Sequence, residues 1–156
     1  GCVDSLDTQE VVRYLCGEVF GIRDEDRRRK TVVFRLREHI RRDKSGIAPM
    51  VGFISEGVDL KGFSVADKIV GKAAAMLFVL AGIKNAYGEV MSIGGLEFLE
   101  QNDIGASYNV LTKKIINRSG TDICPMEKAV ENISVPTEAF LSIKETIRKL
   151  KEAESQ

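Results

Sequence analysis

The stretch VGKAAAMLFVLAGI, residues 70–83, decides the fold class of this chain. It is almost wholly apolar and rich in alanine and leucine, and Gly82 stands where a helix would end. These features predict a helix buried on all sides. The apolar run 73–83 is about half of a membrane span, so no membrane partner is expected. The segments 63–67 and 86–91 on either side predict strands, and a buried helix between two strands is typical of an α/β domain.

The rest of the chain after residue 30 continues this alternation. A tight turn at 36–37 is expected to join two strands, 31–34 and 38–42, in a hairpin. An amphipathic helix follows over 47–58, where Pro49 is tolerated because it falls in the first turn. The further expected elements are a helix at 92–101, a strand at 106–111, and helices at 124–132 and 136–153. The final helix carries an apolar stripe of Phe140, Ile143, Ile147 and Leu150.

The sequence divides into a main domain and two short flanking segments. Residues 31–150 are expected to form the α/β domain, with helices on both faces of the sheet. Residues 1–30 predict a helical extension, because a capping box at 7–10 precedes apolar residues at helical spacing. Residues 151–156 predict a frayed tail.

The composition of the chain limits which partners and which kinds of site we expect. The chain has 156 residues, with 23 Lys and Arg balanced by 23 Asp and Glu, which argues against an overall polyelectrolyte partner. Segment 23–44 has ten basic against five acidic residues; we interpret it as a solvated face, with an RNA-associated module as the weaker alternative. Three scattered cysteines and one histidine predict no disulfide framework, no metal site and no cofactor, and a cytoplasmic location.

The first candidate site is ADKIVGKA, residues 66–73. It runs from the end of a strand into the buried helix, where α/β sheets place their ligands. The free N–H groups of a helix start and the charge of Lys72 predict an anion site. Gly71, Asp67 and Lys68 belong to the same stretch. The alternative is a pair of surface lysines with Asp67 as a helix cap or ion-pair partner.

The second candidate site follows the last strand. Asn117, Arg118 and Thr121 lie in a turn-forming stretch, where Arg118 could clamp an anion through a bidentate contact. Cys124 precedes Pro125 and stands at the start of a helix, which lowers the pKa of a thiol; the alternative is a buried, inert cysteine. Glu127 falls in the first turn of that helix.

The segments GFSVADKIVGKAAA (62–75) and IINRSGTDICPMEKAV (115–130) together resemble one family. It is the uncharacterised bacterial domain family that takes the cytidine-deaminase-like fold and lacks the deaminase zinc motifs. The resemblance covers roughly residues 31–150 and implies a three-layer α/β/α sandwich around a mixed sheet. It also implies that the two candidate sites meet in one pocket. Zinc-dependent deamination is excluded, because no second thiol follows Cys124 at the required spacing.

From these observations we expect a domain that binds a small anionic, nucleotide-like ligand. In this interpretation Lys72, Arg118 and the helix ends hold the anion, and Asp67 and Glu127 accept hydrogen bonds. The alternative is a metal-free enzyme with Cys124 as nucleophile and Lys68 or Lys72 as general acid/base. The sequence leaves open whether the chain is an enzyme. By analogy with deaminase-like folds, which often associate, a homo-oligomer is a further expectation.

Overall fold

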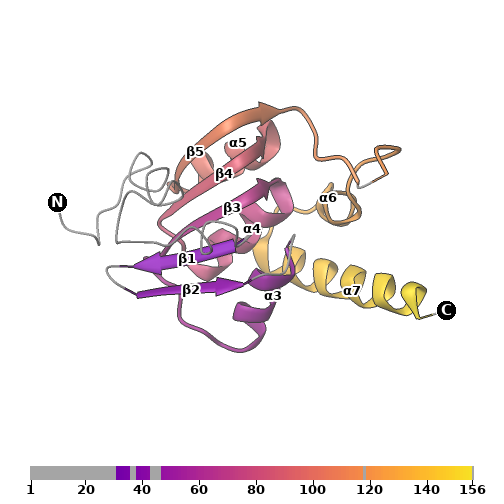
Figure 1. Cartoon of the computed structure of the whole chain (residues 1–156), viewed down its shortest axis with the longest axis horizontal. Helices are drawn as coiled ribbons and strands as arrows, with labels where there is room; N and C mark the ends of the chain where they lie inside the picture. Colours follow the sequence, from indigo (N-terminus) through magenta and orange to yellow (C-terminus); the bar gives the residue numbers. More distant parts are fainter. Residues whose placement is uncertain (1–30, 36–37, 43–46, 118, 156) are drawn as a thin grey trace.

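The computed structural model describes residues 31–35, 38–42, 47–117 and 119–155 (Figure 1). Its strands are β1 (Thr31–Arg35), β2 (Glu38–Arg42), β3 (Ser64–Val70), β4 (Asn85–Ser92) and β5 (Gly105–Thr112). Its helices are α3 (Ala48–Ser55), α4 (Lys72–Ala81), α5 (Ile93–Gln101), α6 (Pro125–Val130) and α7 (Pro136–Glu154). The predicted extension 1–30, the turn at 36–37 and most of the basic segment 23–44 lie outside the described residues.

The described strands form one mixed sheet in the order β2-β1-β3-β4-β5. β1 pairs antiparallel with both β2 and β3, whereas β3, β4 and β5 run parallel. The predicted hairpin strands and the predicted α/β class are therefore confirmed. β2 and β5 are the two edges of the described sheet, and Figure 1 shows them at opposite sides of the molecule.

The predicted buried helix is α4. Residues 73–78 are all buried, and Gly82 closes the helix in the left-handed conformation at φ 76°. That conformation favours glycine because it has no Cβ. The helix begins later than predicted, since Val70 is the last residue of β3 and Gly71 is the N-cap.

The described helices gather around α4, which contacts all four of the others. α4 connects β3 to β4, and α5 connects β4 to β5. Each connection leads to the neighbouring parallel strand, and both lead in the same direction across the sheet. Right-handed crossovers in one direction place both helices on the same face. α4 and α5 therefore cover the same face of the sheet.

Two further helices are shorter than predicted, and α7 differs from the prediction in burial. α3 ends at Ser55 and α6 at Val130, so both are shorter than the sequence predicted. In α7, Ile143 is fully buried but Leu150 is 41% exposed, because the second half of the helix projects away from the body (Figure 1). The helix continues to Glu154, through most of the segment predicted as a frayed tail. Among the described residues, none of the helices combines the length and the apolar character needed to cross a bilayer.

Candidate functional site

The starts of α4 and α6 meet in a direct contact. The carboxylate of Glu127 accepts one hydrogen bond from the backbone N–H of Lys72 and one from that of Ala73, each at 2.9 Å. Each oxygen takes a different donor, so the carboxylate bridges two neighbouring amides. The structure thus brings together three of the predicted site residues: Gly71, Lys72 and Glu127.

This contact satisfies a need that arises from the sequence of α4. The first amides of a helix have no partner within the helix, and an acceptor side chain at the N-cap usually serves them. α4 has glycine at its N-cap and no acidic residue in its first turn. Glu127, in the first turn of α6, supplies the missing acceptor from another helix. Its negative charge lies at the positive ends of two helix dipoles.

Two glycines make room for the contact. A Cβ on Gly71 would lie 2.1 Å from Oε1 of Glu127, so any larger residue there displaces the carboxylate. A Cβ on Gly95 of α5 would lie 2.9 Å from the carbonyl carbon of Gly71. The amide of Gly95 is itself held by the side chain of Ser92, the N-cap of α5, at 3.0 Å. The backbone of Gly71 is therefore packed between Glu127 on one side and α5 on the other.

The ammonium group of Lys72 points to the far end of α6. Its Nζ donates to the carbonyl oxygens of Val130, at 3.0 Å, and Glu131, at 3.3 Å. These carbonyls end the helix, where a positive charge is favourable. Lys72 therefore acts as a C-terminal cap for α6.

Asp67 and Lys68 lie within β3 instead of at its end. Asp67 is buried, with 6% of its surface exposed, and its carboxylate accepts a hydrogen bond from the backbone N–H of Lys68 at 2.8 Å. The side chain of Lys68 is exposed. Three residues of extended strand span about 10 Å, so Asp67 is well separated from the start of α4.

The loop before α6 is organised by Asn117. Its Oδ1 accepts from the backbone N–H of Thr121 at 3.0 Å, and its carbonyl accepts from Gly120 at 3.1 Å. The hydroxyl of Thr121 lies 2.8 Å from that of Ser119, and both residues are exposed. These contacts shape the loop itself. The predicted clamp, Arg118, lies outside the described residues.

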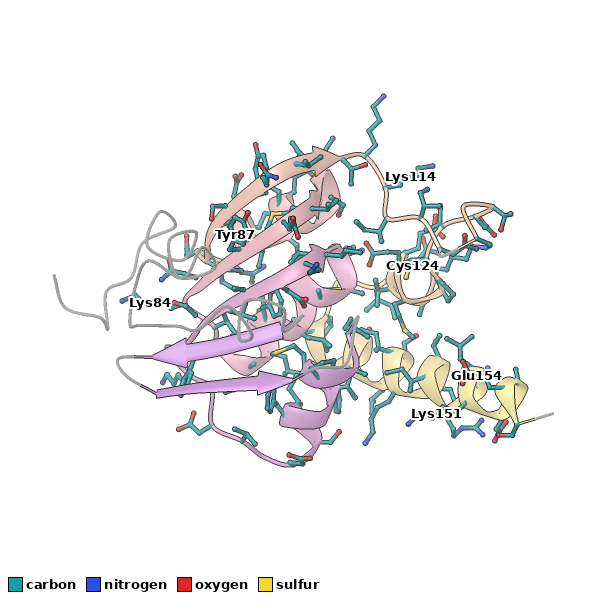
Figure 2. The ribbon with its side chains drawn as sticks, in the orientation of Figure 1. Lys84, Tyr87, Lys114, Cys124, Lys151 and Glu154 are labelled. Carbon is teal, nitrogen blue, oxygen red and sulfur yellow. The ribbon has the colours of Figure 1, made fainter. Side chains whose placement is uncertain are left out.

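Cys124 is the N-cap of α6, one turn before Glu127 (Figure 2). Its thiol is free and half-buried. Its amide donates to the carbonyl of Ile115 at 2.9 Å, and its carbonyl accepts from Lys128 at 3.1 Å, which fixes the backbone at the start of the helix. In the part of the chain that the structure describes, no three His, Cys, Asp or Glu side chains are grouped so as to hold a metal ion.

An exposed ion pair supports the loop from outside. Lys128 of α6 pairs with Asp122. The hydrogen bond from Lys128, followed by that from the Ile123 amide, lowers the pKa of Asp122 below its ordinary value. The pair joins the loop to the helix that carries Glu127.

Sequence reasoning selected Lys72 and Glu127, which meet at this junction, but missed how they act on one another. It assigned Lys72 and Glu127 to a ligand, whereas in the structure each binds a helix end. It did not identify Gly95 or the carbonyls of Val130 and Glu131. A signal was present in the sequence, because a buried helix that starts with Gly71 and lacks an acidic first turn must find its acceptor elsewhere.

Comparison with known proteins gives a family and a fold. A family model described as a domain of unknown function (DUF1893) matches residues 25–147. No curated protein matches the chain. Among solved structures, the crystal structure of a DUF1893 family protein (TM1506) from Thermotoga maritima is similar, with a TM-score of 0.74 and 23% sequence identity. The match covers 96% of this chain and 95% of that one, and it shows a shared fold.

Proposed function

The chain belongs to the DUF1893 family, and from that premise we propose that it binds a small anionic ligand at the start of α4, in the position that Glu127 occupies. One observation carries the proposal. The amides of Lys72 and Ala73 already hold a carboxylate, with one donor for each oxygen. The same two donors fit the oxygens of a ligand carboxylate or phosphate.

Glu127 then acts as an internal competitor. Because the Glu127 carboxylate is attached to the same chain, its effective concentration at the two amides is high. An external anion must therefore bind the amides of Lys72 and Ala73 more strongly than Glu127 does. When the Glu127 side chain moves away, the absence of a Cβ at Gly71 leaves room for an anion to approach the two amides. A phosphate, with more charge than a carboxylate, is the class expected to compete best.

The finer fold that we propose is the three-layer, cytidine-deaminase-like sandwich of the resembled bacterial family. The burial of β3 supports it. Four consecutive residues at its start, from Ser64 to Asp67, are all buried. Consecutive strand residues point to opposite faces of a sheet, so the first half of β3 is covered on both faces. The proposed location is the cytoplasm.

Thermal denaturation with a panel of anions tests the proposal. The panel contains acetate, inorganic phosphate and nucleoside monophosphates, and it is applied to the wild-type chain and to Glu127→Ala. We expect Glu127→Ala alone to be less stable, and to gain more from phosphate-bearing anions than the wild type, because its amides are vacant. Binding at a hundred times Kd adds about 2.7 kcal/mol, which is easily measured.

Glu138→Ala is the matched control, because Glu138 is also an acidic residue in the first turn of a helix and is exposed. It removes the same charge and leaves the α4 amides occupied. Its response to anions should equal that of the wild type. If no anion stabilises Glu127→Ala more than Glu138→Ala, the α4 start is a structural junction and the proposal fails.

The second candidate is a metal-free enzyme with Cys124 as nucleophile. The observation that favours it is the free, half-buried thiol of Cys124 at the N-cap of α6. Alkylation measured against pH tests it. A Cys124 thiol that reacts no faster than a model thiol at neutral pH removes the nucleophile.

A further inference from the structure

Lys72 contacts both ends of α6. Its backbone N–H donates to Oε1 of Glu127, in the first turn of the helix, at 2.9 Å. Its ammonium group donates to the carbonyls of Val130 and Glu131, the last residue of the helix and the residue after it. One residue of α4 therefore links the carboxylate that occupies the α4 amides to the end of the helix that carries this carboxylate.

α6 is too short to be a stable helix on its own. It has six residues, whereas isolated helices shorter than about 12–15 residues are only marginally stable in water. Within the described residues, the side chain of its N-cap, Cys124, forms no capping hydrogen bond. Its helical state therefore depends on neighbouring elements. Val130 is fully buried, and the hydroxyl of Ser142 donates to the carbonyl of Ala129 at 2.9 Å. Lys72 adds a charged cap at the same end.

The start of α6 is less firmly held than its end. Residues 119–122, which lead into the helix, are all exposed, and Glu127 is half-buried. Segments with few buried contacts open locally at the lowest cost in free energy. We therefore expect the first turn of α6 to open by local unfolding while Val130 stays attached to the core. Such opening removes the Glu127 carboxylate from the α4 amides.

We propose that Lys72 is a latch on the α4 amides: it stabilises helical α6, and helical α6 keeps Glu127 on these amides. The ammonium stabilises the helical state alone, because the dipole that it faces exists only while α6 is formed. An anion that takes the amides stabilises the opened state, so Lys72 and the anion act on one equilibrium in opposite directions. The inference rests on the proposed function, since it concerns access to the same two amides. It reverses the role expected from the sequence, in which Lys72 holds the anion.

Isothermal titration calorimetry with inorganic phosphate measures the direction of this effect. Lys72→Met should raise the affinity of the chain for phosphate by about fivefold, because α6 then opens more easily. In a chain that also carries Glu127→Ala, no carboxylate competes for the amides, so the same change should leave the affinity equal or lower it. A Lys72 that bound the anion directly would lower the affinity in both backgrounds, and that result overturns the latch.

Two further variants separate the latch from a general effect of charge. Lys72→Arg keeps a positive charge and N–H donors for the carbonyls of Val130 and Glu131, so its affinity for phosphate should stay close to that of the wild type. Lys149→Met, the same loss of charge at an exposed position of α7, should also leave the affinity unchanged. If Lys149→Met raises the affinity as much as Lys72→Met does, the latch is overturned.

Hydrogen exchange without any anion tests the latch separately from ligand binding. The amides of residues 72 and 73 should exchange about fivefold faster in Lys72→Met than in the wild type, and the amide of Ile143 in α7 at an unchanged rate. Faster exchange, together with no phosphate binding to Glu127→Ala, supports the latch and rejects the proposed function. Phosphate binding to Glu127→Ala, together with exchange that Lys72→Met leaves unaltered, supports the proposed function and overturns the latch.

Discussion

Lys72 and Glu127 each complete the helix that carries the other. Glu127, on α6, accepts from the first amides of α4, and Lys72, on α4, donates to the last carbonyls of α6. The two residues are 55 positions apart in the chain, so the exchange fixes one helix against the other. Neither helix has a side-chain cap from its own N-cap residue. The first three predictions test the two halves of this exchange.

Removal of the Glu127 carboxylate should destabilise the fold. Glu127→Ala leaves the amides of Lys72 and Ala73 without their acceptor, and loss of a charged cap costs about 2 kcal/mol. Urea denaturation measures the change. Glu138→Ala, in the first turn of α7, should stay within about 0.5 kcal/mol of the wild type. Equal losses in the two variants would contradict a specific role for Glu127.

Gly71→Ala should reproduce the effect of Glu127→Ala, because its Cβ would lie 2.1 Å from Oε1 and 2.5 Å from Cδ of Glu127. We expect a loss of about 2 kcal/mol, and a double variant with Glu127→Ala that is less destabilised than the sum, since both changes remove one contact. Gly52→Ala is the control. Gly52 lies in α3, and a Cβ added to it would meet nothing within 4 Å, so alanine there should stabilise by about 0.5–1 kcal/mol.

The other half of the exchange is tested by Lys72→Met, which keeps the length of the side chain and removes the ammonium. The carbonyls of Val130 and Glu131 lose their donor, so the end of α6 should fray, at a cost of about 1 kcal/mol. Hydrogen exchange at the amides of Lys128 and Glu131 should be faster. Lys149→Met, on the exposed side of α7, should change neither the stability nor the hydrogen exchange of these two amides. Unaltered exchange in Lys72→Met would show that α6 does not need this cap.

The fold was largely predictable from the sequence, because its main signals are local. The apolar run that became α4 and the glycine that ends it require only propensity and backbone geometry. The boundary at Val70 was misplaced because an apolar residue suits the end of a buried strand as well as a buried helix. Leu150 was misplaced because periodicity gives the face of a helix but not where the neighbouring layer ends.

The site was only partly predictable, because its contacts depend on packing. Spacing predicted that Lys72 and Glu127 lie at helix starts, and the structure places both in the first turns of their helices. It could not show that the two side chains act on each other's helices, because that depends on how two helices 55 positions apart in the chain pack together. Asp67 was included for its position near the end of a strand, yet it is buried within β3.

The ion pair of Asp122 and Lys128 predicts a pH effect. Lys128 lowers the pKa of Asp122 below its ordinary value of 3.8, so the pair contributes stability above that value and loses it as pH falls through the folded pKa. Lys128→Gln should raise the pKa of Asp122 toward 3.8, which an NMR titration of its carboxyl group measures. Lys113→Gln, at another exposed lysine, should not shift the pKa of Asp122. A pKa that stays low without Lys128 would assign the effect to the Ile123 amide alone.

Two adjacent glycines of α5 provide the sharpest test of how closely the backbones pack behind Gly71. A Cβ on Gly95 would lie 2.9 Å from the carbonyl carbon of Gly71, 3.0 Å from its oxygen and 3.1 Å from the oxygen of Val70. These are backbone atoms, which cannot rotate away, so Gly95→Ala should cost about 1–3 kcal/mol. A Cβ on Gly94 meets only the Cβ of Lys72, at 3.9 Å, an ordinary contact. Gly94→Ala should therefore be neutral or stabilising by up to about 1 kcal/mol, as expected for alanine in place of glycine in a helix. Thermal or urea denaturation measures the free energy of unfolding of the two variants. Equal values for Gly95→Ala and Gly94→Ala would mean that α5 does not hold the start of α4 in place.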